Sequence, residues 1–465
     1  MNNDLDTGAP QPGGDPLGAA LADAEGGPLG KMVDPGEPVF TDVTATGSMI
    51  VREPVSAGYI WLMILATFGG FAALVAPIGL SLALRVQQLA PDNVEYLGYV
   101  VGAGAAVAAI SAPLTGMWSD RTRTRFGRRR PFSLIGALVG LAGLAFIAWA
   151  PSIPLVIVGW MIAQLGWGTA LNSLILSQAD RLPEAQRGKV AGLSGVVQMI
   201  ASVAGVGVAS AFIGSDYLVF LVPGAIGLFF FVLWTLLVKE PSSVDLPAPA
   251  KLSIGKVLAN MVFNPRKHPD FAWNWLGRLF FNFGVTFATT FTTVFFAARL
   301  SDSGKVADVG SLIVILSLAG VVATAGGAML GGFLSDKLRR RRIFVLLAGL
   351  AFTAGAIIMA VGGTNAGLLI GGSVITSIGL GVFSAVDQAI VLDVLPERDT
   401  DAGRFVGINV YSTSIAQALA PIVAVPLLLI GAEGADRNYA LLFIVASACT
   451  LIGGNIIMIF VRTAK

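Results

Sequence analysis

The stretch GMWSDRTRTRFGRRRPF, residues 116–132, places six arginines and one aspartate between two long apolar segments. The rest of the 465-residue chain is poor in charge: charged residues make up 12% of it and hydrophobic residues 55%. A soluble domain carries about 25% charged residues. Short basic loops between long apolar segments are typical of proteins that cross a membrane several times. The stretch therefore indicates a membrane protein whose main solvent is lipid.

Twelve apolar runs are long enough for a membrane-spanning helix, which needs about 20 mostly apolar residues. They lack the strict alternation of membrane β-barrel strands, so we expect helices. The runs cover residues 57–84, 96–118, 131–150, 153–178, 190–213, 217–238, 271–298, 309–333, 343–361, 366–392, 405–431 and 438–461.

The distribution of Lys and Arg predicts the orientation, because cytoplasmic loops are enriched in these residues. With both termini in the cytoplasm, 25 of the 30 Lys and Arg residues lie in cytoplasmic loops and tails. The four in outer loops are Arg85, Arg299, Lys305 and Arg437, and Arg278 lies within a span. We therefore expect a multi-pass protein of the plasma (inner) membrane, with the lipid bilayer as a partner and both termini cytoplasmic.

Composition also divides the chain into parts. Residues 1–55 are acidic and rich in Gly and Pro, which predicts a disordered cytoplasmic tail. Residues 239–270 contain five prolines and form the longest loop between spans. We expect this loop to be a cytoplasmic linker between an N-terminal six-helix bundle, residues 56–238, and a C-terminal one, residues 271–465.

Two motifs recur in the second half of the chain. GMWSD at 116–120 returns as GFLSD at 332–336, an offset of 216 residues. DRLPE at 180–184 returns as DVLPE at 393–397, an offset of 213 residues. Each copy follows the matching helix of its half. We therefore predict an all-α membrane fold of two pseudo-symmetric six-helix bundles, an arrangement that holds substrate at mid-membrane depth between its halves.

The repeated motifs also predict a gate at the cytoplasmic ends of the helices. Carboxylates there can pair with arginines and tie one half to the other. The motif glycines would remove side chains where helices approach closely. The expected gate residues are Gly116, Asp120, Arg121, Arg128, Arg129, Asp180, Arg187, Gly332, Asp336 and Asp393.

These motifs resemble a known family. From Gly116 the chain reads G-x-x-x-D-R-x-x-x-x-x-G-R-R, which resembles the loop signature between helices two and three of the major facilitator superfamily. SDR at 119–121 followed by RFGRRRPF at 125–132 is similar to the sucrose:proton symporter group and to other glycoside–pentoside–hexuronide:cation symporters. The resemblance implies a secondary active transporter that works by alternating access and takes up sugars or glycosides, usually with protons.

Charges inside the spans are candidates for coupling, because burying a charge costs several kcal/mol unless it is paired or hydrated. Arg278 and Asp387 are such charges. We expect Asp387 to carry the coupling proton, with Arg278 as its partner or as a donor to sugar hydroxyls. A structural pair near the cytoplasmic rim is the alternative. Related symporters often carry an acid within helix one, two or four, and this chain has none there, which leaves the coupling ion open.

A sugar site needs hydrogen-bonding groups around an aromatic ring. Polar and aromatic residues near the middle of helices four, seven, ten and eleven could supply them, or could instead hold helices together. The candidates for substrate binding are Gln164, Trp167, Asn172, Asn282, Gln388, Asn409 and Tyr411.

Other functions stay open or are excluded. A drug or metabolite efflux antiporter would carry a Gly-Pro motif in helix five, but residues 190–210 are rich in glycine and lack proline. An uncoupled facilitator and a non-transporting sensor or scaffold are further alternatives. An enzyme is not expected, because the lone His268 cannot complete a catalytic triad, and the single cysteine, Cys449, provides no disulfide. We expect no metal, no cofactor and no nucleic acid, and a monomer.

Overall fold

The computed structural model describes residues 40–43, 49–52, 54–244, 262–397, 402–432 and 436–462. The chain divides into two units. The smaller unit contains a short hairpin in which β1 (Phe40–Val43) pairs antiparallel with β2 (Met49–Arg52). Residues 1–39, 44–48 and 53 of the predicted tail lie outside the described residues, and so do residues 245–261 of the predicted linker.

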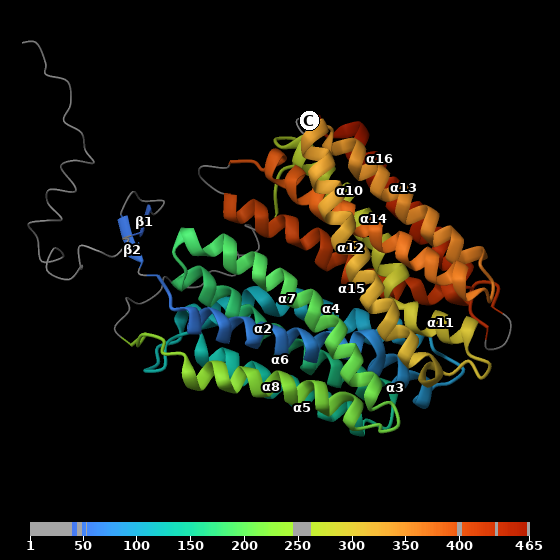
Figure 1. Cartoon of the computed structure of the whole chain (residues 1–465), viewed down its shortest axis with the longest axis horizontal. Helices are drawn as coiled ribbons and strands as arrows, with labels where there is room; N and C mark the ends of the chain where they lie inside the picture. The colour runs from blue at the N-terminus through green and yellow to red at the C-terminus, as the bar shows by residue number, and fades with distance from the viewer. Residues whose placement is uncertain are drawn as a thin grey trace, which may run out of the picture. The chain divides into compact units, whose positions relative to one another are not determined.

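The larger unit is a body of long helices, which Figure 1 colours from blue through green in the first half to red at the end of the second. The first half contains α2 (Ala57–Ala76), the π-helical turn η1 (Pro77–Ser81), α3 (Leu82–Leu89), α4 (Tyr96–Arg121), α5 (Arg130–Trp149), α6 (Ile153–Arg181), α7 (Glu184–Ala211) and α8 (Leu218–Leu237). The second contains α10 (Pro269–Thr290), α11 (Thr292–Leu300), the 3₁₀ turn η2 (Val306–Val309), α12 (Gly310–Leu338), α13 (Arg341–Val361), α14 (Ala366–Val394), α15 (Ala402–Leu429) and α16 (Tyr439–Phe460).

The number of spans agrees with the sequence. Eleven helical segments are long and apolar enough to cross a membrane, and α10 with α11 forms a twelfth span that bends by 43°. The bend falls at Phe291, whose backbone (φ −103°, ψ 6°) leaves the helical region. The first span contains η1, because Pro77 lacks a backbone N–H to continue the regular ladder. The twelve predicted runs are confirmed, and these two local distortions are additions to them.

Glycine contacts repeat between the halves. In the first half, a Cβ on Gly166 of α6 would lie 2.1 Å from the backbone nitrogen of Gly140 on α5. In the second half, a Cβ on Gly355 of α13 would lie 2.5 Å from the carbonyl oxygen of Gly372 on α14. These are the third and fourth spans of each half. Backbones that touch directly leave no room for a side chain, so small residues set the spacing of these helices.

A second glycine contact joins the first and last spans of each half. A Cβ on Gly227 of α8 would lie 2.9 Å from the carbonyl oxygen of Gly69 on α2, and a Cβ on Gly453 of α16 would lie 2.5 Å from that of Gly277 on α10. The first and last spans of the two bundles therefore cross in the same way. The halves share their packing as well as their motifs.

Candidate functional site

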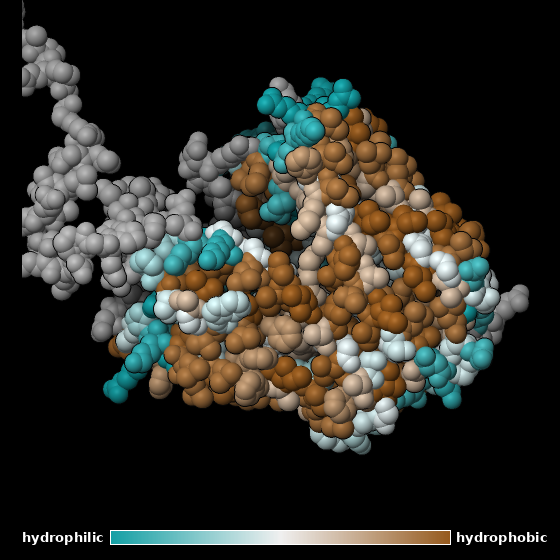
Figure 2. Space-filling model, in the orientation of Figure 1, coloured by the Kyte–Doolittle hydropathy of each residue, from teal (hydrophilic) through white to brown (hydrophobic). Residues whose placement is uncertain are grey.

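The helical body has two ends, a basic end and a far end. The basic end carries the arginine-rich segments 121–130 and 337–342, and the far end carries the loop residues 90–95, 301–309, 431–432 and 436–438. Figure 2 shows apolar side chains over the sides of the body and a recess between the two bundles on the side of the basic end.

Arg278 and Asp387 form an ion pair between α10 and α14. Arg278 Nη1 contacts Asp387 Oδ2, and the Asp387 side chain is 3% exposed. The guanidinium of Arg278 also donates to Thr413 Oγ1 of α15 at 3.4 Å. The pair therefore joins three helices of the second half. The other carboxylate oxygen, Asp387 Oδ1, is buried and has no hydrogen-bond partner among the described residues.

Two buried amides extend this polar cluster toward the basic end. Asn274 lies one turn before Arg278 on α10, and Asn409 lies one turn before Thr413 on α15. Asn274 is fully buried, and neither its amide oxygen nor its amide nitrogen has a partner in the described part of the chain. The amide oxygen of Asn409 is also unpartnered there. Buried polar groups without protein partners are the usual positions of bound water.

Asn409 is one of the residues predicted from the sequence, whereas Asn274 is not. The available signal was the four-residue spacing between Asn274 and Arg278, which puts both side chains on one face of α10. The remaining candidates of the second half are Asn282, which donates to the carbonyl of Arg278 at 2.8 Å, the exposed Gln388 beside Asp387, and the half-buried Tyr411.

The candidates on α6 do not form one surface. Asn172 donates to the carbonyl of Ala112 on α4 at 3.0 Å, and the side chain of Gln164 also lies against α4. Trp167 instead is fully buried. Its indole ring packs on Gly140 of α5, on Gly227 of α8 and beside Phe231. Because neighbouring helices enclose this ring inside the first bundle, we leave Trp167 out of the proposed substrate site.

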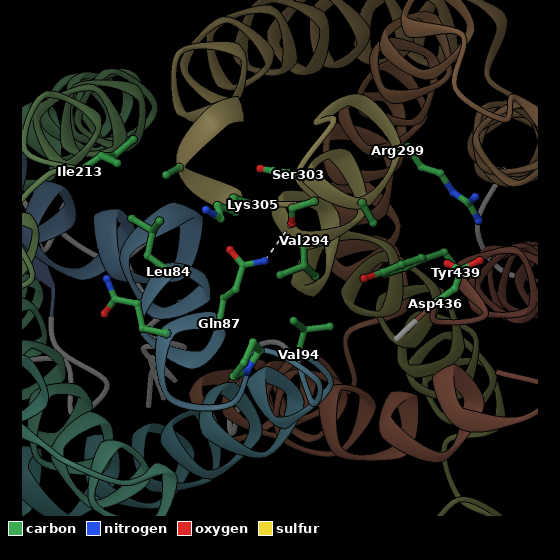
Figure 3. Close-up of a pocket in the computed structure, with 15 residues that line it drawn as sticks. Leu84, Gln87, Val94, Ile213, Val294, Arg299, Ser303, Lys305, Asp436 and Tyr439 are labelled. Atoms are coloured by element: carbon green, nitrogen blue, oxygen red, sulfur yellow. Dashed lines mark hydrogen bonds between the residues drawn. The ribbon is translucent and has the colours of Figure 1, made fainter. Parts of the chain in front are cut away.

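Contacts between the halves gather at the far end. Arg437 Nε lies 2.7 Å from Glu95 Oε2, with 4% and 2% of the two side chains exposed, and Arg437 also donates to the carbonyl of Asp92. Gln87 donates to the carbonyl of Gly304 at 2.9 Å and accepts from the N–H of Val306 at 2.7 Å (Figure 3). These contacts hold loops of the first half against loops of the second. The sequence placed Arg437 among the outer cations but did not predict its partner.

α4 and α15 cross near the same end. A Cβ on Gly98 would lie 2.2 Å from the carbonyl oxygen of Pro421, and one on Gly102 would lie 2.8 Å from that of Ala418. Thr293 adds a hydrogen bond of 2.6 Å to the carbonyl of Gly79. The two halves are therefore closely packed at the far end.

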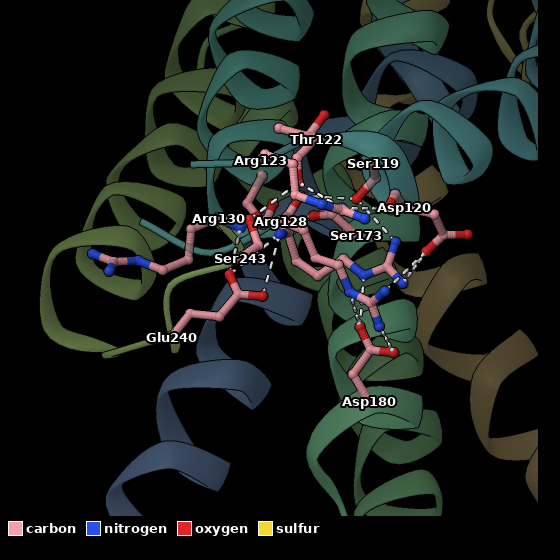
Figure 4. Close-up of polar contacts among 12 residues, drawn as sticks. Ser119, Asp120, Thr122, Arg123, Arg128, Arg130, Ser173, Asp180, Glu240 and Ser243 are labelled. Carbon is pink, nitrogen blue, oxygen red and sulfur yellow. Dashed lines mark hydrogen bonds and ion pairs between the residues drawn. The ribbon is translucent and has the colours of Figure 1, made fainter. Parts of the chain in front are cut away.

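At the basic end, the predicted gate residues of the first half form an ion-pair network (Figure 4). The buried Arg129 contacts Asp180 through Nε at 2.7 Å and Asp120 through Nη2 at 2.6 Å, and Arg128 contacts Asp180 at 2.7 Å. Burial opposes the charge of Arg129, but hydrogen bonds and charges from Asp180 and Asp120 outweigh it and raise the pKa of the guanidinium. Arg129 therefore stays charged.

The start of the linker is part of the same network. The Glu240 carboxylate accepts from the backbone N–H groups of Arg129 and Arg130 at the N-terminus of α5, at 3.2 and 3.0 Å. A carboxylate at this position complements the helix dipole. Gly127 has φ +84°, and a Cβ there would lie 2.3 Å from the Glu240 carboxyl carbon. The glycine before the arginines thus allows the loop to close on Glu240.

The second half has a matching network. Arg341 contacts Asp336 at 2.8 Å and Asp393 at 2.7 Å, as Arg129 contacts Asp120 and Asp180. Each of these ion pairs lies within one half, whereas the motifs predicted a tie between the halves. Of the other gate residues, Arg187 donates to the carbonyl of Leu182 at 3.0 Å.

The prediction that Gly116 and Gly332 allow helices to approach closely is wrong. A Cβ on Gly116 would lie 3.7 Å from the nearest side-chain atoms of α6, and one on Gly332 would lie 3.6 Å from Ala385. Both distances are ordinary van der Waals contacts. Close helix approach therefore does not require glycine at these two positions.

Comparison with known proteins gives one family and several partial relatives. The family described as the Major Facilitator Superfamily matches residues 60–421 and 307–465. The general alpha-glucoside permease of Schizosaccharomyces pombe is 40% identical over 63 residues, which are 14% of this chain and 11% of that protein. The human proton-associated sugar transporter A is 34% identical over 96 residues, which are 21% of this chain and 12% of that protein. The matched segments thus span about an eighth of these relatives' lengths or less.

Solved structures share the fold over nearly the whole chain. The nucleoside transporter NupG superposes with a TM-score of 0.69 over 87% of this chain and 99% of its own, at 12% identity. A bacterial homolog of the human lysosomal transporter Spinster, solved in an inward-facing and unoccupied conformation, gives a TM-score of 0.66 over 88% and 98%, at 15% identity. At such identities the likeness concerns the arrangement of helices.

Proposed function

The chain belongs to the Major Facilitator Superfamily, and we propose that this transporter carries a sugar or glycoside together with protons by alternating access. Transport, rather than enzyme chemistry, is common to the family and to the relatives found. The sugar class is supported by the short matches to an alpha-glucoside permease and a proton-associated sugar transporter. The coupling is supported by the buried pair of Arg278 and Asp387.

The pair is the observation that carries the proposal. A charged Asp387 holds Arg278, and a protonated Asp387 releases it, so that the guanidinium can donate to sugar hydroxyls. Proton binding and sugar binding then act on one shared arginine and are thermodynamically linked. Asn282, one turn from Arg278, and the exposed Gln388 beside Asp387 would complete the substrate contacts. Water at the unpartnered amide of Asn274 and the unpartnered amide oxygen of Asn409 would connect Asp387 with the basic end.

We assign the basic end to the cytoplasm of a plasma (inner) membrane, on the positive-inside distribution of Lys and Arg. The contacts of Glu95, Gln87 and Gly98 then close the outer end. The ion pairs at the inner end lie within their own halves. Together these features support an inward-facing conformation. The outward-facing conformation would require the contacts at the outer end to separate.

Uptake into proteoliposomes tests the proposal. A panel of glycosides is assayed with and without an inward proton gradient, in the wild-type protein, in Asp387→Asn and in the control Asp302→Asn, an exposed acid of the far-end loop. We expect uphill accumulation in the wild type and the control, and its loss in Asp387→Asn. If Asp387→Asn still accumulates substrate against its gradient, Asp387 does not couple transport to protons.

An uncoupled facilitator is the second candidate, favoured by the lack of an acid within the predicted spans 57–84, 96–118 and 153–178 of helices one, two and four. It predicts equilibration of substrate that is independent of the proton gradient. The same assay separates the two candidates, because a facilitator never raises the internal substrate concentration above the external one.

A further inference from the structure

A cavity of about 720 Å³ lies at the far end between the two halves (Figure 3). This volume falls within the range of about 300–1,000 Å³ that is typical of small-molecule sites. The first half contributes Leu84 and Gln87 of α3, and Val94 of the following loop. The second half contributes several more residues, namely Val294, Arg299, Ser303, Lys305, Asp436 and Tyr439. The cavity is distinct from the polar cluster around Asp387, since none of that cluster's residues lines it.

The lining combines apolar walls with hydrogen-bonding groups at its edge. Leu84, Val94 and Val294 supply the walls, and the hydroxyl of Tyr439 points into the space from the opposite side (Figure 3). The cations of Lys305 and Arg299 lie on opposite sides rather than together. A sugar ring offers apolar C–H faces and hydroxyl groups at its edge, and so matches this distribution. A compact anion would need the two cations side by side.

The cavity depends on a closed far end. Gln87 lines it and uses both of its amide atoms to hold the backbone of Gly304 and Val306 across the junction. The buried pair of Glu95 and Arg437 also joins the halves at this end. When the halves separate here, Leu84 and Val294 move apart with them, and the cavity is lost. A ligand that fills it therefore stabilises the closed far end by its own binding energy.

We propose that this cavity is a second glycoside site, and that its occupation holds the transporter closed at the far end. The choice of a glycoside rests on the proposed function, while the coupling of occupation to closure rests on the geometry alone. External glycoside at high concentration then slows the return to the outward-facing state. The site acts as an inhibitory sensor of outside substrate.

Maltose binding to the purified full-length protein tests the inference. Isothermal titration is compared for the wild type, for the cavity variant Tyr439→Phe/Lys305→Gln, and for the central variant Arg278→Gln. Tyr439→Phe removes one hydroxyl and keeps the buried ring, and Lys305 is exposed. We expect two binding events in the wild type. The cavity variant should lose one of them, and Arg278→Gln should lose the other.

Hydrogen exchange of residues 301–309 gives a second readout that does not depend on transport. Maltose should slow this exchange severalfold in the wild type and in Arg278→Gln, but not in the cavity variant, with glycerol at equal osmolality as the control for a solvent effect. If Arg278→Gln abolishes all binding and all protection while the cavity variant behaves as wild type, the second site is overturned and the proposed function stands. If uptake fails for every glycoside while maltose still protects residues 301–309, the proposed function fails and the cavity site remains. If maltose neither binds nor protects, the cavity site is overturned.

Discussion

Arg278 and Asp387 form a buried ion pair, with 18% and 3% of their side chains exposed. Removing one partner of a buried ion pair leaves the other charge uncompensated, which costs about 3–5 kcal/mol. We expect Arg278→Gln to lower the thermal midpoint of the purified protein strongly. The double variant Arg278→Gln/Asp387→Asn should lie closer to wild type, because it leaves no lone charge. Thermal unfolding of the wild type, Arg278→Gln, Asp387→Asn and the double variant measures this coupling. Losses of stability that simply add would contradict it.

The residues of the site were predictable to different degrees. Arg278 and Asp387 could be predicted as a pair, because charges within apolar spans are rare and need partners. Asn274 was missed, because its four-residue spacing from Arg278 was the only signal and a single amide in a span more often packs against a neighbouring helix. The role of Trp167 is ambiguous from the sequence, because an aromatic ring in a membrane helix fits a packed core as well as a sugar site. The packing of α5 and α8 around the Trp167 ring favours the packed core over the sugar site. This packing between helices cannot be predicted from the apolar pattern of the sequence.

At the scale of elements, glycine contacts determine how closely the helices approach. A Cβ on Gly166 would lie 2.1 Å from the backbone of Gly140, whereas a Cβ on Gly168, half a turn further along α6, meets nothing within 4 Å. Gly166→Ala should force α5 and α6 apart and reduce folded yield and thermal stability. Gly168→Ala should be neutral or stabilising by about 0.5–1 kcal/mol, because alanine favours a helix over glycine. Size-exclusion yield and thermal midpoints compare the two. Equal effects would contradict the role of the Gly166 contact.

Arg129 connects the loop after α4 to the end of α6. It donates to Asp180, Asp120 and Ser119 through different nitrogens of one guanidinium, with 3% of its side chain exposed. A lysine keeps the charge but cannot present this planar set of donors. We expect Arg129→Lys to lower the thermal midpoint and slow transport, while maltose affinity stays near wild type. The exposed Arg125→Lys is the control. A loss of binding with unchanged stability would mean that Arg129 contacts substrate.

The sequence predicted helices well where composition alone determines them. About 20 apolar residues in lipid form a helix whatever their neighbours, which is why the twelve runs are confirmed. The bend at Phe291 and the π-helical turn at Pro77 depend on local hydrogen bonding and packing. Apolar composition carries little information about either.

At the scale of the molecule, the duplication was visible in the motifs, and the structure extends it to packing and ion pairs. Arg341 with Asp336 and Asp393 repeats Arg129 with Asp120 and Asp180. What the repeat could not predict is which end of the molecule is closed. The closing residues Glu95 and Arg437 occupy unrelated loops 342 residues apart and belong to no repeated motif. In the alternating access that we propose, one sequence adopts both the inward-facing and the outward-facing state, so the sequence alone does not indicate which end is closed.

Glu95→Gln tests how firmly the far end is closed. The buried Arg437 would lose its counter-charge in the closed state, and truncating one partner of such a pair costs about 3–5 kcal/mol. Opening of the halves at this end should then become more frequent. We expect hydrogen exchange of residues 301–309 to rise at least about tenfold, since 1.4 kcal/mol corresponds to a factor of ten.

Asp92→Asn is the matched control for Glu95→Gln. Its side chain is exposed, and its carbonyl can still accept from Arg437 after the substitution. The basic end should respond in the opposite sense, because a transporter that opens more often at one end closes more often at the other. Exchange at the basic end should therefore slow in Glu95→Gln and stay unchanged in Asp92→Asn. If exchange rises at both ends of Glu95→Gln, the substitution has loosened the fold as a whole, and the pair is not a conformational lock.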